Sequence, residues 1–202
     1  MAKLTPKAKA GVGVGGGVAA VIAAVIAIEG GFVDHPDDPG GATKHGITEA
    51  VARQCGYTGR MQDLTEGFAA RCYEKRYVDK PGFRPIVDLS DALGSEAVDS
   101  GVNVGVARPA KWFQESLNHL NRRGRDYSDV VVDGDIGPAT IFAYRQLQEL
   151  RGEKKACELM VKLMDAKQAA HYMRLATDNS KFENFVVGWV DHRLWNVPLE
   201  NC

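Results

Sequence analysis

Near its start the chain carries an uncharged stretch, residues 10–28, that contains only Gly, Ala, Val and Ile. Lysines precede this stretch, and the acidic residue Glu29 follows it directly. A helix of about 20 apolar residues crosses a bilayer, and positively charged flanks stay on the cytoplasmic side. The stretch therefore predicts an N-terminal membrane helix with Met1 in the cytoplasm, and it constrains how everything attached at Glu29 can fold.

The span is a weak one, because it lacks Leu and Phe and contains many glycines. Each Gly opposes helix formation by about 1 kcal/mol relative to Ala, and each Val or Ile favours the bilayer by only about 0.3–0.6 kcal/mol. Three interpretations stay open: a signal peptide cleaved just before Glu29, a permanent anchor, or a helix that leaves the membrane and packs on a soluble body. We favour the third, since small residues allow close helix packing.

The composition is that of a globular protein. A net charge of −1 gives no broad basic surface for nucleic acid, and 202 residues suffice for one domain or one domain with an appendage. The four cysteines show no CxxC spacing and no paired histidine, so we expect neither a metal site nor any other cofactor. Export would favour one or two disulfides, whereas buried or free thiols remain the alternative.

Two turn signals follow the membrane-like stretch. The glycines at residues 30–31 suit the left-handed conformation that ends a helix, and the Pro-Gly-Gly run at residues 39–41 predicts a tight turn. A chain that doubles back here can bring Asp38 and Thr43 to face Glu29 across a cleft. We therefore expect a small hairpin beside a cleft that holds two carboxyl groups.

Two facing carboxyl groups suit glycoside hydrolysis, in which one protonates the leaving oxygen and the other activates water or stabilises the cation. Glu29 adjoins an apolar helix, and burial raises the pKa of a carboxyl group, which suits the acid. Asp38, or its neighbour Asp37, lies in a polar turn and should stay ionised, while the Thr43 hydroxyl can position a water. The simpler alternative is that Glu29 merely follows a span and that the aspartates merely cap a turn.

Residues 29–48, EGGFVDHPDDPGGATKHGIT, resemble the signature of glycoside hydrolase family 108, whose members are N-acetylmuramidase endolysins of phages with a lysozyme-like fold. The resemblance implies that Glu29 is the catalytic acid, and Asp38 matches the DPGG position. Phage lysozymes use a Glu–Asp–Thr triad of similar spacing, which implies a catalytic role for Thr43. Gly41 and His45 are candidate substrate contacts, with His45 standing where an aromatic residue, often Tyr, is expected.

Joined to the weak span, this motif resembles signal-anchor-release endolysins. Such proteins are exported, held inactive in the host inner membrane with the N-terminus in the cytoplasm, and freed into the periplasm when the membrane is depolarised. The resemblance implies transient contact with lipid and an indirect dependence on a holin or pinholin. No cysteine lies in residues 10–28, so activation should come from refolding and not from a thiol in the anchor.

The rest of the chain has helical periodicity. Capping residues and spacing predict helices over residues 48–55, 65–77, 153–175 and 182–195, and further helices that begin near residues 90 and 109. The apolar residues of the last predicted helix are expected in the core, and they are Phe185, Val186, Trp189 and Leu194.

A DG-x-x-GP-x-T block at residues 133–140 is common in peptidoglycan-binding helical modules. Residues from about 99 to the C-terminus resemble the predicted peptidoglycan domain found behind this muramidase domain. Asn103 and Asp133 are accordingly candidate substrate contacts. For Asp133 a structural role as a hydrogen-bond acceptor is the alternative, and a calcium loop is disfavoured because further oxygen ligands are missing.

Together these patterns predict a mainly α, lysozyme-like α+β fold with a small β-hairpin near residues 38–48. We expect a signal-anchor-release segment at residues 1–28, a muramidase region at 29–98 and a helical peptidoglycan-binding-like region at 99–202, packed as one monomeric body. The predicted activity is cleavage of the β-1,4 bond after N-acetylmuramic acid in peptidoglycan. A lytic transglycosylase that uses only Glu29, and a non-catalytic membrane-tethered wall-binding protein, are the alternatives.

Overall fold

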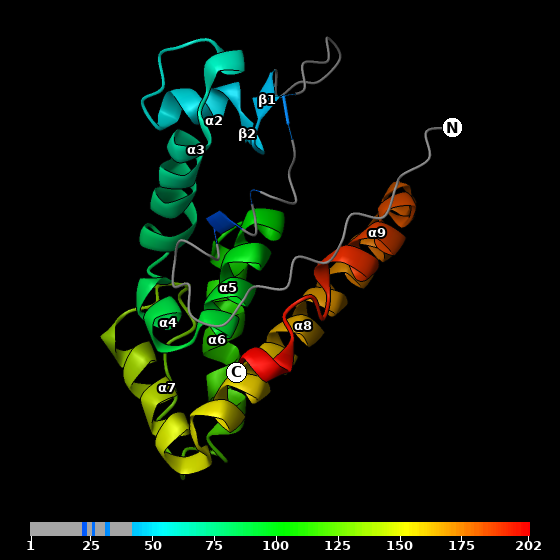
Figure 1. The fold of residues 1–202 in the computed structure, drawn as a ribbon. Helices are drawn as coiled ribbons and strands as arrows, with labels where there is room; N and C mark the ends of the chain where they lie inside the picture. Colours follow the sequence, from blue (N-terminus) through cyan, green and yellow to red (C-terminus); the bar gives the residue numbers. More distant parts are fainter. Residues whose placement is uncertain (1–21, 24–25, 27–30, 33–41) are drawn as a thin grey trace.

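The computed structural model describes residues 22, 23, 26, 31, 32 and 42–202. Helices dominate this part of the chain, and a two-stranded antiparallel sheet accompanies them (Figure 1). This architecture confirms the predicted mainly α, lysozyme-like α+β class with its small hairpin.

The hairpin pairs β1 (Thr43–Lys44) with β2 (Ile47–Thr48), and Thr43 lies opposite Thr48. Two residues with positive φ connect the strands, His45 at 52° and Gly46 at 72°. Positive φ at both central positions is the geometry of the tightest hairpin turns, and it matches the right-handed twist of paired strands. The hairpin therefore presents the His45 side chain at its tip.

Short helices follow the hairpin. Thr48 caps α2 (Glu49–Gln54) by accepting a hydrogen bond from the backbone of Val51 at 3.4 Å, and Thr65 caps α3 (Glu66–Tyr73) in the same way. The chain then continues through a π-helix, η2 (Glu74–Asp79), into α4 (Arg84–Leu89), and the 3₁₀ turn η1 (Met61–Asp63) precedes α3. Side-chain caps thus set the starts of both α2 and α3, as their sequences predict.

Longer helices build the rest of the body. They are α5 (Asp91–Val104), α6 (Ala107–Leu120), α7 (Pro138–Arg151), α8 (Glu153–Asp178) and α9 (Glu183–Arg193), with 3₁₀ turns η3 (Ser180–Phe182) and η4 (Leu199–Asn201). Helix α8 is the long axis against which α5, α6, α7 and α9 all pack (Figure 1). The residue-98 boundary predicted from sequence falls inside α5, so a continuous helix joins the two predicted regions.

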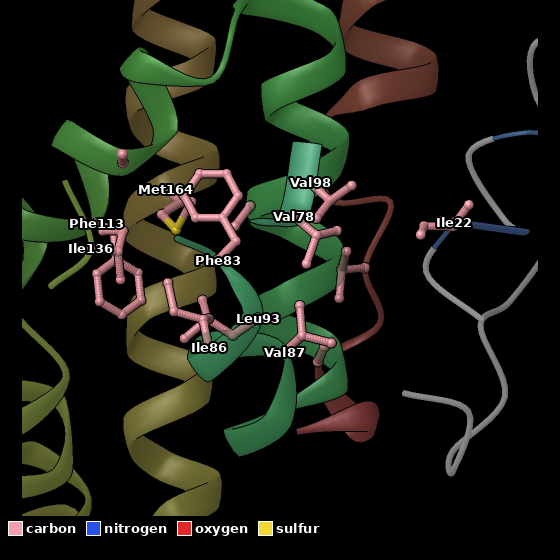
Figure 2. Packing of buried hydrophobic residues seen from close by; sticks show 14 of the residues in the cluster. Ile22, Val78, Phe83, Ile86, Val87, Leu93, Val98, Phe113, Ile136 and Met164 are labelled. Carbon is pink, nitrogen blue, oxygen red and sulfur yellow. The ribbon is translucent and has the colours of Figure 1, made fainter. Parts of the chain in front are cut away.

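One hydrophobic core runs through these helices. Figure 2 shows Phe83, Ile86 and Leu93 packed against Phe113 of α6 and Met164 of α8. Because this cluster takes residues from both sides of α5, the two predicted regions share it, and a smaller cluster of Val104, Tyr172 and Leu194 lies in the second region.

Three residues of the apolar N-terminal stretch are described, and all three are helical. Ile22 and Ile26 are only 3% and 6% exposed and belong to the main core, whereas Ala23 faces solvent. The rest of the predicted span lies outside the described residues. Within the residues that are described, no helix is long and apolar enough to cross a bilayer.

All four cysteines form disulfides, which resolves the alternative between disulfides and thiols that the sequence left open. Cys55–Cys72 ties the end of α2 to α3. Cys157–Cys202 ties α8 to the last residue of the chain and closes a sequence separation of 45 residues. Cross-links of this kind stabilise a fold largely by restricting the unfolded chain.

Helix α9 departs from expectation. Phe185 was expected in the core but is 55% exposed, and no residue of α9 is buried. The helix contacts mainly α8 and η3. It therefore lies on the edge of the bundle, where these two elements leave its apolar side chains partly or largely exposed.

Candidate functional site

The predicted site residues fall into two groups. Glu29, Asp37, Asp38 and Gly41 lie outside the described residues, so the facing of the two carboxyl groups stays a prediction. The other candidates are placed, and they are Thr43 and His45 on the hairpin, Asn103 in the last turn of α5, and Asp133 in the loop before α7.

The hairpin that carries Thr43 and His45 is closed at its base by one backbone hydrogen bond and is tied to η1 by another contact. Ala42 accepts a backbone hydrogen bond from Glu49 at 2.9 Å, and the Lys44 ammonium donates to the backbone carbonyl of Gln62 in η1. Thr43 and His45 are both half-buried. Their side chains are thus held on a short, anchored element, which suits groups that must meet a substrate in one geometry.

Asn103 is oriented by a tyrosine from the other half of the chain. The Tyr172 hydroxyl of α8 donates to Asn103 Oδ1 at 2.9 Å, and Tyr172 is itself buried. With Oδ1 occupied, the Asn103 amide nitrogen remains as a donor on a half-exposed side chain. Asn103 can therefore offer N–H groups to a ligand from a fixed position.

A buried polar seam between α5 and α8 supports that tyrosine. Gln168 donates to the Tyr172 hydroxyl at 2.6 Å, and Gln168 Oε1 accepts from Ser100 at 2.6 Å. Ser100 Oγ also lies 3.1 Å from Glu96 Oε1. The buried Ser100 hydroxyl thus lies between the Glu96 carboxyl group and the Gln168 side-chain amide, and it connects Glu96 to the hydrogen bonds that hold Tyr172.

Burial raises the pKa of two carboxyl groups in this seam. Glu96 is almost fully inaccessible, and burial is the first cause that raises its pKa well above the usual value, followed by the nearby carboxylates Asp165 and Asp99. Asp165 also has a raised pKa, of about 6, again mainly because of burial. Burial thus favours the protonated form of both carboxyl groups in the seam.

Asp99 and Asp165 brace the segment that follows α9. Asp99 Oδ1 pairs with Arg193 at 2.8 Å, and its Oδ2 accepts from Asn196 at 3.1 Å. Asp165 Oδ1 accepts from the backbone N–H of Trp195 at 2.9 Å. These contacts connect α5, α8 and the C-terminal segment through groups that sequence reasoning did not single out.

A signal for the seam exists in the sequence. Its α5 members recur at helical spacing, and so do its α8 members; the two sets are Glu96, Ser100 and Asn103, and Asp165, Gln168 and Tyr172. Each set marks one face of a helix. The pattern indicates two polar faces that need partners, although it does not say that they pair with each other.

Asp133 is engaged within its own loop. Its Oδ1 accepts from Gln114 at 2.7 Å and from the backbone of Asp135 at 2.9 Å. The backbone hydrogen bond from Asp135, followed by that from Gln114, lowers the pKa of Asp133. The geometry matches the structural alternative weighed for this residue, and substrate contact by Asp133 stays a prediction.

In the described ranges no group of three or more His, Cys, Asp or Glu side chains could hold a metal ion. A cavity of about 160 Å³ opens beside the Cys157–Cys202 disulfide, between Ser90 and Asn201. None of the placed candidate residues lines this cavity.

Comparison with known proteins gives two consecutive family matches. Residues 22–105 match the model of Glycosyl hydrolase 108, and residues 108–194 match the Predicted Peptidoglycan domain. A solved structure described as "Structure of Brucella abortus SagA" is 27% identical, covers 87% of this chain and 88% of its own, and superposes with a TM-score of 0.61. No curated protein matches the chain.

These matches support a lysozyme-like glycoside hydrolase of the glycosyl hydrolase 108 type that acts on peptidoglycan. They confirm the two resemblances drawn from the motifs at residues 29–48 and 133–140. They do not reach the signal-anchor-release type, which stays a prediction.

Proposed function

We propose that the chain is an N-acetylmuramidase that hydrolyses the β-1,4 bond between N-acetylmuramic acid and N-acetylglucosamine. The observation that carries the proposal is the glycosyl hydrolase 108 match, which spans Glu29, Asp38 and Thr43 together. Glu29 donates its proton to the glycosidic oxygen as the bond breaks. Asp38 or Asp37 supports the attacking water or the developing cation, and Thr43 orients that water.

The stereochemical outcome depends on the distance between the two carboxyl groups. A separation of roughly 6.5–9.5 Å leaves room for a water and gives inversion, whereas about 5 Å gives a covalent intermediate and retention. Fresh products of the enzyme distinguish these two routes by the anomeric form of the new reducing end.

The substrate proposal also draws on the second family match. Residues 108–194 match a peptidoglycan domain and share one hydrophobic core with the catalytic match. Attachment of this part to the wall polymer would keep the enzyme on its substrate between cleavages, because the second contact becomes intramolecular.

Replacement of the proposed acid tests the function. We expect Glu29→Gln to abolish the release of reducing ends from purified peptidoglycan, since general-acid assistance is typically worth about 10²–10⁴-fold. Glu96→Gln is the matched control, because Glu96 is a buried glutamate that has no role in the proposed chemistry and whose pKa burial raises. If Glu29→Gln releases reducing ends at the wild-type rate, the proposal is wrong.

The two alternatives give different results in the same assays. A lytic transglycosylase would form anhydromuramyl products and would tolerate Asp38→Asn. A non-catalytic wall-binding protein would release no reducing ends even as the wild type.

We propose further that the apolar N-terminal stretch is retained in the active protein after a membrane-held stage. The supporting observation is that Ile22 and Ile26 lie in the main core, so cleavage before Glu29 would remove buried side chains. An intact mass of the active periplasmic form tests retention, and a mass that begins near Glu29 would contradict it. Replacing several of the glycines in residues 10–28 by Leu should hold the protein in the inner membrane and delay lysis.

A further inference from the structure

The residue after the C-cap of α9 is an exposed tryptophan in an unusual backbone conformation. The side chain of Trp195 is 64% exposed, and its φ is 51°. A bulky residue rarely adopts positive φ, since the left-handed conformation costs of the order of 1 kcal/mol or more. Such a conformation persists only where the surrounding structure enforces it, and it is often associated with function.

The surrounding structure does enforce it. Hydrogen bonds hold three of the four residues 193–196, because Asp99 binds Arg193 and Asn196 while Asp165 binds the backbone N–H of Trp195. Both carboxylates are buried. The segment therefore has little freedom to turn the indole inward.

Apolar neighbours complete the clamp. Leu194, which precedes Trp195, is buried in the smaller hydrophobic cluster. Val197, which follows Asn196, is buried in the main core. Buried side chains before and after Trp195, with an exposed indole between them, are the arrangement expected of a displayed side chain. An indole whose place was in the core would need none of these braces.

The other two tryptophans differ from Trp195. Trp189 is stacked between Tyr172, at 4.9 Å, and Phe185, at 5.9 Å. Trp112 lies 5.9 Å from the His171 ring. Across residues 42–202, no aromatic ring or cation is paired with Trp195, so a face of its indole is open to a ligand.

We propose that Trp195 is a stacking platform for a sugar ring of the peptidoglycan glycan strand. The inference rests on the proposed function for the class of ligand. A pyranose ring presents an apolar C–H face that fits a flat indole, and the two-angle side chain loses little entropy when it binds. The buried braces add preorganisation, which is where a rigid binding surface gains affinity.

Binding to purified peptidoglycan tests the platform. In a Glu29→Gln background, Trp195→Ala should weaken co-sedimentation with purified peptidoglycan sacculi up to about tenfold, and Trp195→Phe should restore part of the loss. Phe142→Ala is the matched control, because Phe142 on α7 is also 64% exposed and belongs to no braced segment. Reducing ends are measured in the same samples, so failure of the catalytic proposal is seen separately.

Two further measurements separate a role of the indole in binding from a role in stabilising the fold. Trp195→Gly relieves the positive φ, so it should be at least as stable as Trp195→Ala and should bind equally poorly. Soluble N-acetylglucosamine oligomers should shift the tryptophan fluorescence of the wild type, and Trp195→Phe should lose that shift while Trp112 and Trp189 remain.

Three outcomes overturn the platform. The first is wall binding by Trp195→Ala that equals the wild type. The second is a loss of wall binding in Phe142→Ala that equals the loss in Trp195→Ala. The third is a Trp195→Ala protein that binds the wall normally but no longer binds phosphatidylglycerol vesicles. The last result would make the indole a membrane contact.

Discussion

Helices α5 and α9 invert the usual relation between polarity and burial. Most of the 14 residues of α5 are buried, and these include the acidic residues Glu96 and Asp99. None of the 11 residues of α9 is buried, although Phe185 and Val187 are among them. The difference follows from position, because α5 is surrounded by α4, α6 and α8, whereas α9 contacts mainly α8 and η3.

The comparison shows what each helix requires of its neighbours. Polar groups buried in α5 must find partners, since an unpaired buried charge is far more costly than an exposed one. The apolar groups of α9 need no partner to be tolerated, and they leave surface available for ligands. Substitutions in α5 should therefore be costly where equivalent ones in α9 are not.

The largest effect is expected at Asp99. Asp99→Ala removes a buried carboxylate that pairs with Arg193 and accepts from Asn196, and it should destabilise the protein by about 3–5 kcal/mol. Urea unfolding measures this change. Asp191→Ala, at an exposed aspartate of α9, is the control and should change stability by less than about 0.5 kcal/mol. Similar losses in both variants would contradict the contrast.

The second largest effect is expected when a methyl group is added to α5. A Cβ at Gly94 in α5 would lie 2.7 Å from Val87 Cα, so Gly94→Ala should destabilise the protein by about 1–3 kcal/mol. Thermal and urea unfolding measure the loss. A Gly94→Ala protein as stable as the wild type would show that α4 and α5 are not tightly packed.

A smaller effect concerns pH and Asp165. Its folded pKa of about 6 lies above the usual 3.8, so its proton stabilises the folded state at low pH. That stabilisation is lost as the pH rises from about 4 to about 6. Asp165→Asn should remove this part of the pH dependence, about 3 kcal/mol at most, in unfolding curves recorded across that window. Parallel pH profiles for the wild type and the variant would rule out the assignment.

The smallest effect should appear in α9. Nothing lies within 4 Å of a Cβ added at Gly188, so Gly188→Ala should stabilise the protein by about 0.5–1 kcal/mol through helix propensity alone. A rise in the melting temperature is the expected result. A fall would mean that this face of α9 is closely covered.

Local features were predictable from sequence where local chemistry decides them. Thr48 and Ser90 cap the helices that their positions predict. The hairpin lies within the predicted range 38–48, but it turns at His45 and Gly46, and the predicted Pro-Gly-Gly turn at residues 39–41 lies outside the described residues. The burial of Ile22 and Ile26 also agrees with the interpretation of their stretch as a helix that packs on the body.

The remaining features depend on distant partners. Periodicity places Glu96 on an inner face of its helix, but it does not reveal that Ser100 lies between Glu96 and Gln168 of α8 and contacts both. The same limit explains why Phe185 was expected in the core: its spacing is that of an inner face, and only the edge position of α9 leaves it exposed. For the candidate site, the motif at residues 29–48 indicated glycoside hydrolysis. That Tyr172 supports Asn103 could be seen only from the fold.

The most direct test of the central claim is digestion of purified peptidoglycan in heavy-oxygen water, followed by mass spectrometry of the products. Hydrolysis by Glu29 and its partner predicts one heavy oxygen at each new N-acetylmuramic acid reducing end, and none of these products with Glu29→Gln. Anhydromuramyl ends without heavy oxygen, or labelled ends that persist in Glu29→Gln, would contradict the account.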